Sequence, residues 1–282
     1  MKKRVAVTGG SGFIGKKIIE ELLKSGYKVI SLQRSSKKLS NVEIRHFDLS
    51  KVKNITKKMF KDIDIVIHAA ALVHNLKVDV NAHQNLNFEA TKHLFKVCEE
   101  SEVEKFIFIS TVGVYGVYSS SKAISLQTKT CPISPYAIAK LDSERMLLSS
   151  DSLTAISIIR LPLVYGENAP GNYGALQRLA KSKLPLPFLN TKNKRSMVSV
   201  DLVARVIKSA VASKKKHLGL HLLAEKKPYS TKEIIKEIRV QSGLTPMLFP
   251  FSRVLMKLIL SAVGKRKIYE QLYEDLEFVS TI

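Results

Sequence analysis

Three side chains suited to exchanging a proton with an alcohol are spaced so that one helix and one preceding loop can present them together. Tyr136 and Lys140 stand four residues apart, so on a helix they share one face, about a turn apart. A nearby ammonium favours the charged form of a phenol, whose ordinary pKa is about 10, and brings it toward useful acid–base range. Thr111 supplies a hydroxyl that can orient a substrate oxygen. The tyrosine–lysine spacing alone is a weak signal, because it arises by chance on many helices.

The start of the chain carries a phosphate-binding pattern that strengthens this signal. Gly9, Gly12 and Gly15 follow a short apolar strand and precede an amphipathic helix. The first glycine permits a tight turn, the second lets the backbone approach a pyrophosphate, and the third lets the helix pack closely on the strand. The helix begins with Phe13 and Ile14 and directs its free N–H groups and positive dipole end at the phosphates. An ordinary glycine turn is the alternative, but the position of the glycines between a strand and a helix predicts a dinucleotide-binding site.

The residues after the second strand favour NADP, with NAD as the alternative. Sites that prefer NAD usually place Asp or Glu there to bind the ribose hydroxyls, whereas this chain has Gln33 followed by Arg34. A guanidinium attracts a 2′-phosphate, so we expect Arg34 to bind it; stacking on the adenine or facing water is the other interpretation. Further predicted cofactor contacts, after the third and fourth strands, are Asp48, Leu49, Ala69 and Ala70.

Strands and helices alternate along the first part of the chain, which predicts an α/β fold with a Rossmann-type doubly wound parallel sheet. The composition shifts near residue 170. We therefore expect an NAD(P)-binding domain over 1–166 and a smaller α/β substrate-binding lobe over 167–282, with elements at about 198–223 returning to the first domain. The predicted strands are 5–8, 28–33, 42–47, 64–68, 105–110, 155–160 and 218–223, and the predicted helices include 51–60, 86–101, 136–149, 231–242 and one capped by Asp201.

Composition argues against several classes of protein. The chain has 282 residues, a formal net charge of +22 and no long apolar run that would predict a membrane-spanning helix. Cys98 and Cys131 lack metal-ligand spacing and a secretory context, so we expect neither a disulfide nor a metal site, and a cytoplasmic location fits best. The lysines are scattered and no nucleic-acid-binding motif accompanies them, so we do not expect a nucleic-acid partner. A solvated basic surface is favoured over attraction to anionic substrates or an anionic membrane face.

Together these motifs resemble the extended short-chain dehydrogenases/reductases, within the sugar-nucleotide epimerase/dehydratase family. The resemblance implies a Rossmann domain with a substrate lobe, a catalytic triad of Thr111, Tyr136 and Lys140, and a homodimer formed through the helices at 86–101 and 136–149. The motifs that carry it are residues 8–15, Asp48-Leu49, His68-Ala69-Ala70, Asn87, Ser110-Thr111, Pro135-Tyr136 with Lys140, and residues 160–166.

The resemblance also assigns residues that the motifs alone do not explain. It implies that Asn87 helps to hold the cofactor and that Pro162 lies against the nicotinamide. It implies that Asn172 and Arg195 hold the nucleoside diphosphate of the substrate. His74 lies in the polar segment 73–84 and is a candidate substrate contact. His68, at a strand end, is more typical of a packed, hydrogen-bonded histidine than of a catalytic base.

The resemblance leaves several reactions open. Dehydratases of the family place Asp-Glu directly after the catalytic Thr, and this chain has Val112 and Gly113 there, which counts against dehydration. Reduction of a UDP-linked 4-keto-6-deoxyhexose in surface-polysaccharide synthesis suits Arg34, because such a reductase consumes NADPH. A UDP-hexose or N-acetylhexosamine 4-epimerase with bound NAD is the alternative. A non-catalytic NADP sensor is disfavoured by the intact triad.

The stretch 247–267 is apolar, interrupted by Pro250, Arg253 and Lys257, and ends in a basic triplet. A helix there could lie on a membrane surface, which would suit a lipid-linked sugar. The favoured interpretation is that it covers the substrate site.

Overall fold

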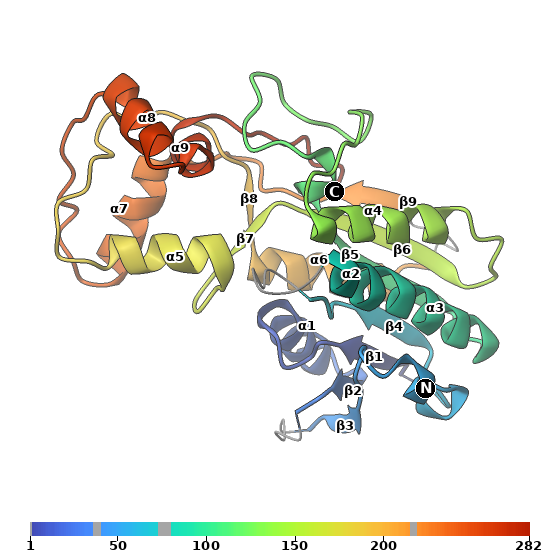
Figure 1. Cartoon of the computed structure of the whole chain (residues 1–282). Coiled ribbons are helices and arrows are strands. Elements are labelled where there is room, and N and C mark those ends of the chain that lie inside the picture. Colours follow the sequence, from blue (N-terminus) through green and yellow to red (C-terminus); the bar gives the residue numbers. More distant parts are fainter. Residues whose placement is uncertain (1, 36–40, 73–79, 215–218) are drawn as a thin grey trace. The chain divides into compact units, whose positions relative to one another are not determined.

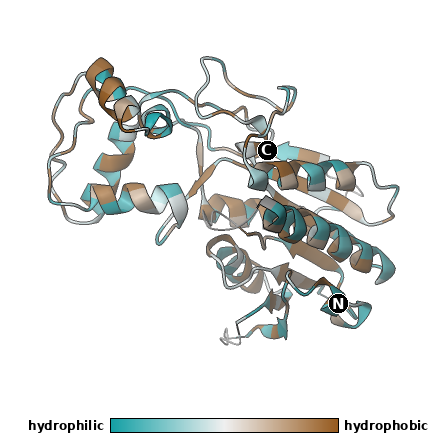
Figure 2. Cartoon of the chain, viewed as in Figure 1, coloured by the Kyte–Doolittle hydropathy of each residue, from teal (hydrophilic) through white to brown (hydrophobic). Residues whose placement is uncertain are grey.

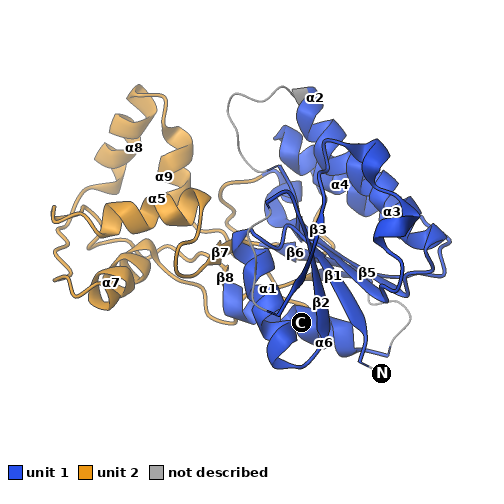
Figure 3. Ribbon diagram, turned by 90° about the horizontal axis from the view of Figure 1, so that it is seen from below, with its two compact units in different colours: residues 1–116, 130–161, 199–221 blue, residues 117–129, 162–198, 222–282 orange. Residues whose placement is uncertain are grey.

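The structure, a computed structural model, describes residues 2–35, 41–72, 80–214 and 219–282. The chain forms two compact units (Figure 3). Unit 1 comprises residues 1–116, 130–161 and 199–221, and unit 2 comprises residues 117–129, 162–198 and 222–282. Each unit is therefore assembled from segments that are far apart in the sequence.

Unit 1 is built on a seven-stranded sheet with the order β3-β2-β1-β4-β5-β6-β9 (Figure 1). Every neighbouring pair from β3 to β6 is parallel. β4 and β6 are buried along their whole length, which explains their apolar sequences. The order reverses between β1 and β4, the kind of switch point at which such sheets bind ligands. The predicted Rossmann-type doubly wound fold is confirmed. The strands are β1 Arg4–Thr8, β2 Lys28–Gln33, β3 Glu43–His46, β4 Ile65–His68, β5 Lys105–Thr111, β6 Ala155–Leu161 and β9 Gly219–Leu222.

Helices cover both faces of this sheet. Figure 3 shows α1 and α6 on one side and α2 to α4 on the other. A cluster of buried side chains, including Phe95, Phe106 and Phe108, fills the space under α3. The helices are α1 Phe13–Lys24, α2 Val80–His83, α3 Ala90–Glu100, α4 Pro135–Leu148 and α6 Val200–Ala212.

Three local predictions differ from the structure. The predicted helix over 51–60 is two 3₁₀ turns, Val52–Asn54 and Lys57–Met59, separated by Ile55 and Thr56 in extended backbone, where the Ile55 side chain is buried. The predicted helix over 86–101 begins earlier, at Val80, and contains a π-helical turn, Gln84–Glu89, before α3. α6 is capped by Ser199, whose side chain accepts the Leu202 N–H, and Asp201 lies in the first turn.

Unit 2 has four helices and a two-stranded sheet in the described residues. α7 begins with a capping box, in which the Ser230 hydroxyl accepts the Glu233 N–H and the Glu233 carboxylate accepts the Ser230 N–H. No helix among the described residues is long and apolar enough to cross a membrane. The elements are β7 Leu163–Tyr165, β8 Met197–Ser199, α5 Gly171–Ala180, α7 Thr231–Gln241, α8 Arg253–Ala262 and α9 Arg266–Tyr273.

Candidate active site

The glycine-rich turn between β1 and α1 makes close backbone contacts at two of the predicted positions. Gly9 has a φ of +68°, and a Cβ built on it would lie 2.9 Å from the Ala70 backbone. A Cβ on Gly15 would lie 2.2 Å from the carbonyl oxygen of Gly9, so α1 packs directly on the turn. Only glycine fits both positions, because the contacts are to backbone atoms.

The amino end of α1 has no side-chain cap. Its N-cap residue is Gly12, and the first turn, which begins with Phe13 and Ile14, contains no acidic residue. By contrast, a serine hydroxyl accepts a backbone N–H at the start of α4, α6 and α7. The first N–H groups of α1 lack a partner within the helix, and an anion at this end is favoured by the helix dipole. The residues present therefore fit the pyrophosphate of a dinucleotide.

The end of β2 carries the residues that the sequence links to the adenosine ribose. Gln33 is buried; its amide oxygen accepts the Ser31 hydroxyl at 2.9 Å, and its nitrogen donates to the Ser35 carbonyl oxygen at 2.8 Å. Arg34 is exposed. Hydrogen bonds from Ser50 hold the pKa of Asp48 below its usual range, and the nearby Arg34 guanidinium adds to this effect. The exposed Arg34 therefore lies within electrostatic reach of Asp48.

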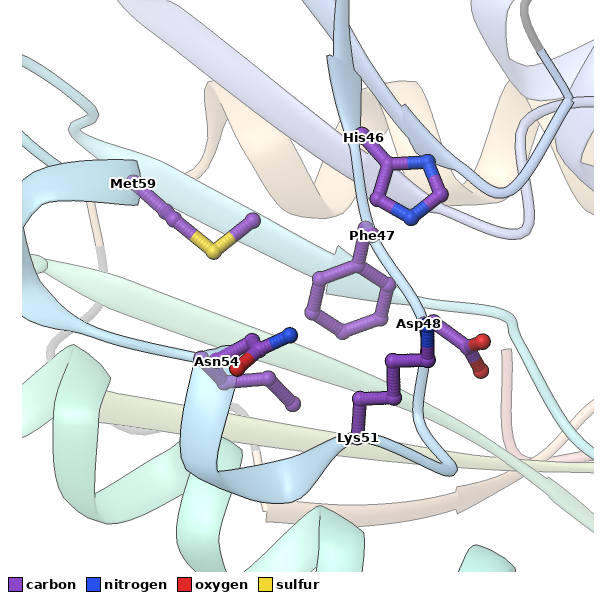
Figure 4. A pocket seen from close by; sticks show the side chains of 7 residues that line it. His46, Phe47, Asp48, Lys51, Asn54 and Met59 are labelled. Atoms are coloured by element: carbon purple, nitrogen blue, oxygen red, sulfur yellow. The ribbon is translucent and has the colours of Figure 1, made fainter.

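Asp48 also lines a small hollow (Figure 4). Leu49, the next residue, packs against the hydrophobic core. The sequence did not predict this hollow, because its walls come partly from the 3₁₀ turns in place of the expected helix. It contains neither Tyr136 nor Lys140. Its lining residues are His46, Phe47, Asp48, Lys51, Asn54, Ile55 and Met59.

Tyr136 and Lys140 lie on one face of α4, as their spacing predicts. The helix starts at Pro135 after Ser134, whose hydroxyl accepts the Ala137 N–H. Lys140 is buried, and its ammonium donates to the Ile109 carbonyl oxygen at 2.8 Å. This bond ties the face of α4 to the carboxyl end of β5. Tyr136 is half-buried, and its ring centroid lies 6.4 Å from that of His83.

Burial dominates the acid–base properties of this face. It raises the pKa of Tyr136 to about 12, because the phenolate is the form that loses hydration. Burial lowers the pKa of Lys140 to about 7, although the Glu144 carboxylate acts in the opposite direction. The sequence analysis expected the Lys140 ammonium to lower the tyrosine pKa, whereas burial acts in the opposite direction. Burial also disfavours the charge on Lys140, which weakens the expected support of the phenolate.

Thr111 stands at the last position of β5 and begins the 3₁₀ turn Val112–Tyr115. Its hydroxyl oxygen accepts the Gly113 N–H at 3.0 Å. A Cβ built on Gly113 would lie 3.3 Å from that oxygen and 3.5 Å from the Ala137 Cβ. The strand end, the turn and the first turn of α4 are therefore adjacent. The structure thus brings the three predicted catalytic residues to neighbouring elements of unit 1.

A buried ion pair lies behind this face, and the sequence analysis missed it. Glu144, one turn after Lys140, is 1% exposed and forms a 2.6 Å ion pair with Arg160 of β6. It also accepts the Ser110 hydroxyl at 2.5 Å, and Arg160 donates to the Tyr115 hydroxyl at 2.8 Å. The available signal was an arginine inside an otherwise apolar strand, which requires a buried partner.

Asn87 lies in the π-helical turn and is buried. Its amide oxygen accepts the Leu72 N–H at 2.7 Å, and its nitrogen donates to the Leu72 carbonyl oxygen at 3.1 Å. It therefore fixes the chain just beyond Ala69 and Ala70, next to the glycine-rich turn. The cofactor contact implied for Asn87 stays a prediction. His74 lies outside the described residues.

His68 is a packed histidine. The Thr91 hydroxyl donates to the Asn87 carbonyl, so it accepts from His68 Nε2 at 2.9 Å, and His68 Nδ1 accepts the Thr8 hydroxyl at 2.7 Å. Burial, aided by the Lys140 charge, holds its pKa well below the usual range. The ring is thus neutral and held by two threonines. Among the described residues no group of three His, Cys, Asp or Glu side chains could hold a metal ion.

Three predicted residues belong to unit 2. Pro162 is buried, and Asn172 is exposed at the start of α5. One Arg195 nitrogen, Nη1, donates to the carbonyl oxygens of Tyr118, Glu270 and Glu274 at 3.1 to 3.2 Å, and burial lowers the pKa of Arg195 to about 10. Arg195 therefore ties three backbone segments together. The diphosphate contact implied for Asn172 and Arg195 stays a prediction.

The chain is similar in sequence or in structure to several known enzymes. A UDP-glucose 4-epimerase of Vibrio cholerae is 28% identical over 98% of this chain and 87% of its own length. A sterol-4-alpha-carboxylate 3-dehydrogenase (decarboxylating) of Dictyostelium discoideum is 39% identical over 58% of this chain and 54% of its own length. The crystal structure of a UDP-glucuronic acid 4-epimerase from Bacillus cereus in complex with NAD has a TM-score of 0.76 at 23% identity, and the match covers 99% of this chain and 90% of that one.

The family assignment rests on most of unit 1. The family model described as "NAD dependent epimerase/dehydratase family" matches residues 5–219. That range contains the glycine-rich turn, Thr111 and the Tyr136–Lys140 pair. The chain therefore belongs to the NAD-dependent epimerase/dehydratase family and is an enzyme of the extended short-chain dehydrogenase/reductase type, as its motifs indicate.

Proposed function

We propose that this enzyme oxidises and reduces C4 of a UDP-linked hexose with NAD(P), and that it acts as a 4-epimerase. The observation that carries the proposal is the bond from Lys140 Nζ to the Ile109 carbonyl oxygen, which fixes the Tyr136–Lys140 face of α4 beside the end of β5 and Thr111. The near full-length similarity to a UDP-glucose 4-epimerase supports the sugar and the position.

Tyr136, Lys140 and Thr111 each have a separate role in the proposed reaction. Tyr136 exchanges a proton with the C4 oxygen, and Lys140 supports the phenolate by its charge. Because the Thr111 oxygen already accepts the Gly113 N–H, its hydrogen is directed away from that bond and can donate to the same substrate oxygen. The pKa of Tyr136, about 12, means that the phenolate must be stabilised when substrate and cofactor bind. Protonated Lys140 is the cation within reach on the same helix face.

The glycine-rich turn and the uncapped start of α1 would hold the dinucleotide, with Asp48, Ala69 and Ala70 along its path. When bound, the nicotinamide supplies the hydride acceptor and donor for the carbon that bears the reacting hydroxyl. The position after Thr111 offers no carboxylate for eliminating water, since Val112 and Gly113 stand there. This supports redox chemistry at C4 without dehydration.

A 4-ketoreductase is the second candidate, and exposed Arg34 favours it. The guanidinium next to Asp48, with no acidic residue at position 33, suits the 2′-phosphate of NADPH. A reductase releases its oxidised cofactor after each turnover. A 4-epimerase retains NAD through oxidation, rotation of the ketosugar and reduction.

Two assays on purified protein separate the candidates. A 4-epimerase interconverts UDP-glucose and UDP-galactose, or the N-acetylated pair, without added nicotinamide. A reductase does not, but oxidises NADPH in proportion to an added UDP-4-ketohexose. Failure of both reactions, with NAD(P) and a panel of UDP-sugars, would contradict the proposal.

Removal of the Tyr136 hydroxyl tests the catalytic role of this residue. Tyr136→Phe should lower kcat by about 10² to 10⁴-fold, because it removes the general acid–base group, while cofactor binding persists. Tyr27→Phe removes the same hydroxyl from a half-buried tyrosine elsewhere in unit 1 and should keep full activity. Equal activity of Tyr136→Phe and the native chain would remove Tyr136 from the reaction.

A further inference from the structure

Five exposed large hydrophobic side chains lie close together in the sequence on α8 of unit 2 and its cap residue. None of the ten residues of this helix is buried, although most of them are apolar. Val254 is 70% exposed, Leu258 is 62% exposed and Leu255 is 48% exposed. Figure 2 shows α8 coloured mostly as hydrophobic. A surface helix normally turns such residues toward the core, so this helix presents an apolar face that the protein leaves uncovered.

The apolar residues occupy one broad arc of the helix. At 3.6 residues per turn, Val254, Leu255, Leu258, Ile259 and the cap residue Val263 spread over about half of the circumference. Met256 and Leu260, which continue this arc, are half-buried, and α8 contacts α9. The exposed arc is therefore the side of α8 that its own unit does not use.

Basic side chains border this arc. Lys257 lies on the polar edge of α8, and the exposed Lys265, Arg266 and Lys267 follow its C-terminal end directly. Arg253 and Arg266 form ion pairs with Glu274 and Glu270. The ion pairs found between described residues do not include Lys257, Lys265 or Lys267. The apolar face thus has cations at its edge and at its end, in a chain whose formal net charge is +22.

We propose that α8 binds an anionic lipid surface. The leucines of the exposed arc enter the boundary between headgroups and acyl chains, and the flanking lysines reach the lipid phosphates along their flexible stems. A second copy of the chain is a poorer occupant. A two-fold interface through this arc would bring the two Lys257 edges together if the helices are antiparallel, or the two basic C-terminal ends together if they are parallel. Like charges at an interface are costly in either case.

The absence of tryptophan in the sequence allows a direct test with the full chain. Leu258→Trp introduces one fluorophore on the arc, and Leu153→Trp introduces one on a fully exposed leucine of unit 1. With vesicles of equal phosphatidylglycerol and phosphatidylcholine in 0.1 M NaCl, Leu258→Trp emission should shift to shorter wavelength. It should not shift with pure phosphatidylcholine. Leu153→Trp should not respond to either vesicle.

Charge substitution gives the matched loss-of-binding test. Leu258→Glu should weaken sedimentation with the same anionic vesicles about tenfold or more, because a carboxylate opposes both burial and anionic lipid. Leu153→Glu has the same change in charge and should bind as the native chain does. Salt at 0.5 M should weaken binding of the native chain, since it screens the lysines.

Three results would overturn the proposal. The first is no binding of the native chain to anionic vesicles, and the second is an equal loss in Leu258→Glu and Leu153→Glu. The third is a native dimer that Leu258→Glu converts to a monomer, with no vesicle binding, which would identify a second copy as the occupant. Both leucines are exposed, so circular dichroism of each variant should match that of the native chain.

Discussion

The two units bury an arginine in different ways. Arg160 of unit 1 is 4% exposed and Arg239 of unit 2 is 1% exposed. The partners of Arg160 are side chains, since it pairs with the Glu144 carboxylate and donates to the Tyr115 hydroxyl. The acceptors found for Arg239 are backbone carbonyl oxygens. They belong to Ala180, the last residue of α5, to Ser182 and Leu184 beyond it, and to Thr245 and Met247 after α7.

We interpret this as a difference in role: Arg239 stabilises the fold, whereas Arg160 belongs to an ion pair that also affects the proposed reaction. Arg239 joins the segments that follow two helices, and the carbonyls at the end of α5 carry the negative end of its dipole. No substitution can remove these acceptors, because they are main-chain atoms. Arg160 is instead balanced by a carboxylate that also raises the pKa of Lys140. We therefore expect substitutions at Arg239 to affect folding and substitutions at Glu144 to affect the reaction as well.

The largest expected effect is the loss of stability in the variant Arg239→Met. This variant removes the charged donor of one buried bond, to the Ala180 carbonyl, and of four part-buried bonds. A hydrogen bond from a charged group contributes about 1.5–3 kcal/mol when buried and less where water has access, so the free energy of unfolding should fall by about 4 kcal/mol or more. That is a large share of the stability of an ordinary domain. Urea unfolding followed by circular dichroism measures it. Arg239→Lys keeps the charge and some of the hydrogen bonds, so its free energy of unfolding should fall less. An equal fall in both variants would show that the planar guanidinium itself is required and that a charged donor alone does not replace it.

The ion pair should behave differently, because both partners can be replaced. Arg160→Met leaves the Glu144 carboxylate buried and unpaired and should cost about 3–5 kcal/mol. The double variant Glu144→Leu/Arg160→Met should recover most of that loss, with a deficit of about 1–2 kcal/mol from the Ser110 and Tyr115 hydroxyls. Urea titrations of the single and double variants give the comparison. A double variant as unstable as Arg160→Met would mean that the pair is needed for packing.

The sequence predicted the fold well because its signals are local and redundant. The apolar runs of β4 and β6 identify buried parallel strands, and the helix predicted over 231–242 is α7, Thr231–Gln241. The helix predicted over 51–60 was wrong, since its lysines fit a helix surface but Ile55 is buried at a break between two turns.

The sequence predicted the candidate site only at positions where the spacing of residues along the chain indicates where their side chains lie. The Tyr136–Lys140 face follows from helical periodicity, and Gly9 and Gly15 follow from their turn. The buried partners of these elements join residues far apart in the sequence, as Glu144 and Arg160 do. Arg239 falls four residues after Ile235, in register with the apolar face of α7, and this was the available sign that it points inward. Its carbonyl partners could not be inferred, because they depend on loops.

The smallest predicted effect connects the ion pair to the proposed reaction. The Glu144 carboxylate stabilises the Lys140 ammonium and so raises its pKa, against the lowering by burial to about 7. Glu144→Gln should lower that pKa further. The ammonium is the active form in the proposed function, and it is lost as pH rises through the pKa. The alkaline limb of kcat/KM should therefore move to lower pH, by on the order of one unit.

This shift can be assigned to Lys140 rather than to His68 or Tyr136, because those two groups do not titrate in the same range. His68 has a pKa well below its usual range, and Tyr136 has one of about 12. Glu21→Gln removes a carboxylate paired with Lys208 elsewhere in unit 1 and should leave the limb in place. The double variant at 144 and 160 also lacks the carboxylate, but it loses the Arg160 cation as well, so its shift should have the same direction as that of Glu144→Gln and be smaller. An unmoved limb in both variants would mean that Glu144 serves stability alone, and the arginines of the two units would then differ only in their partners.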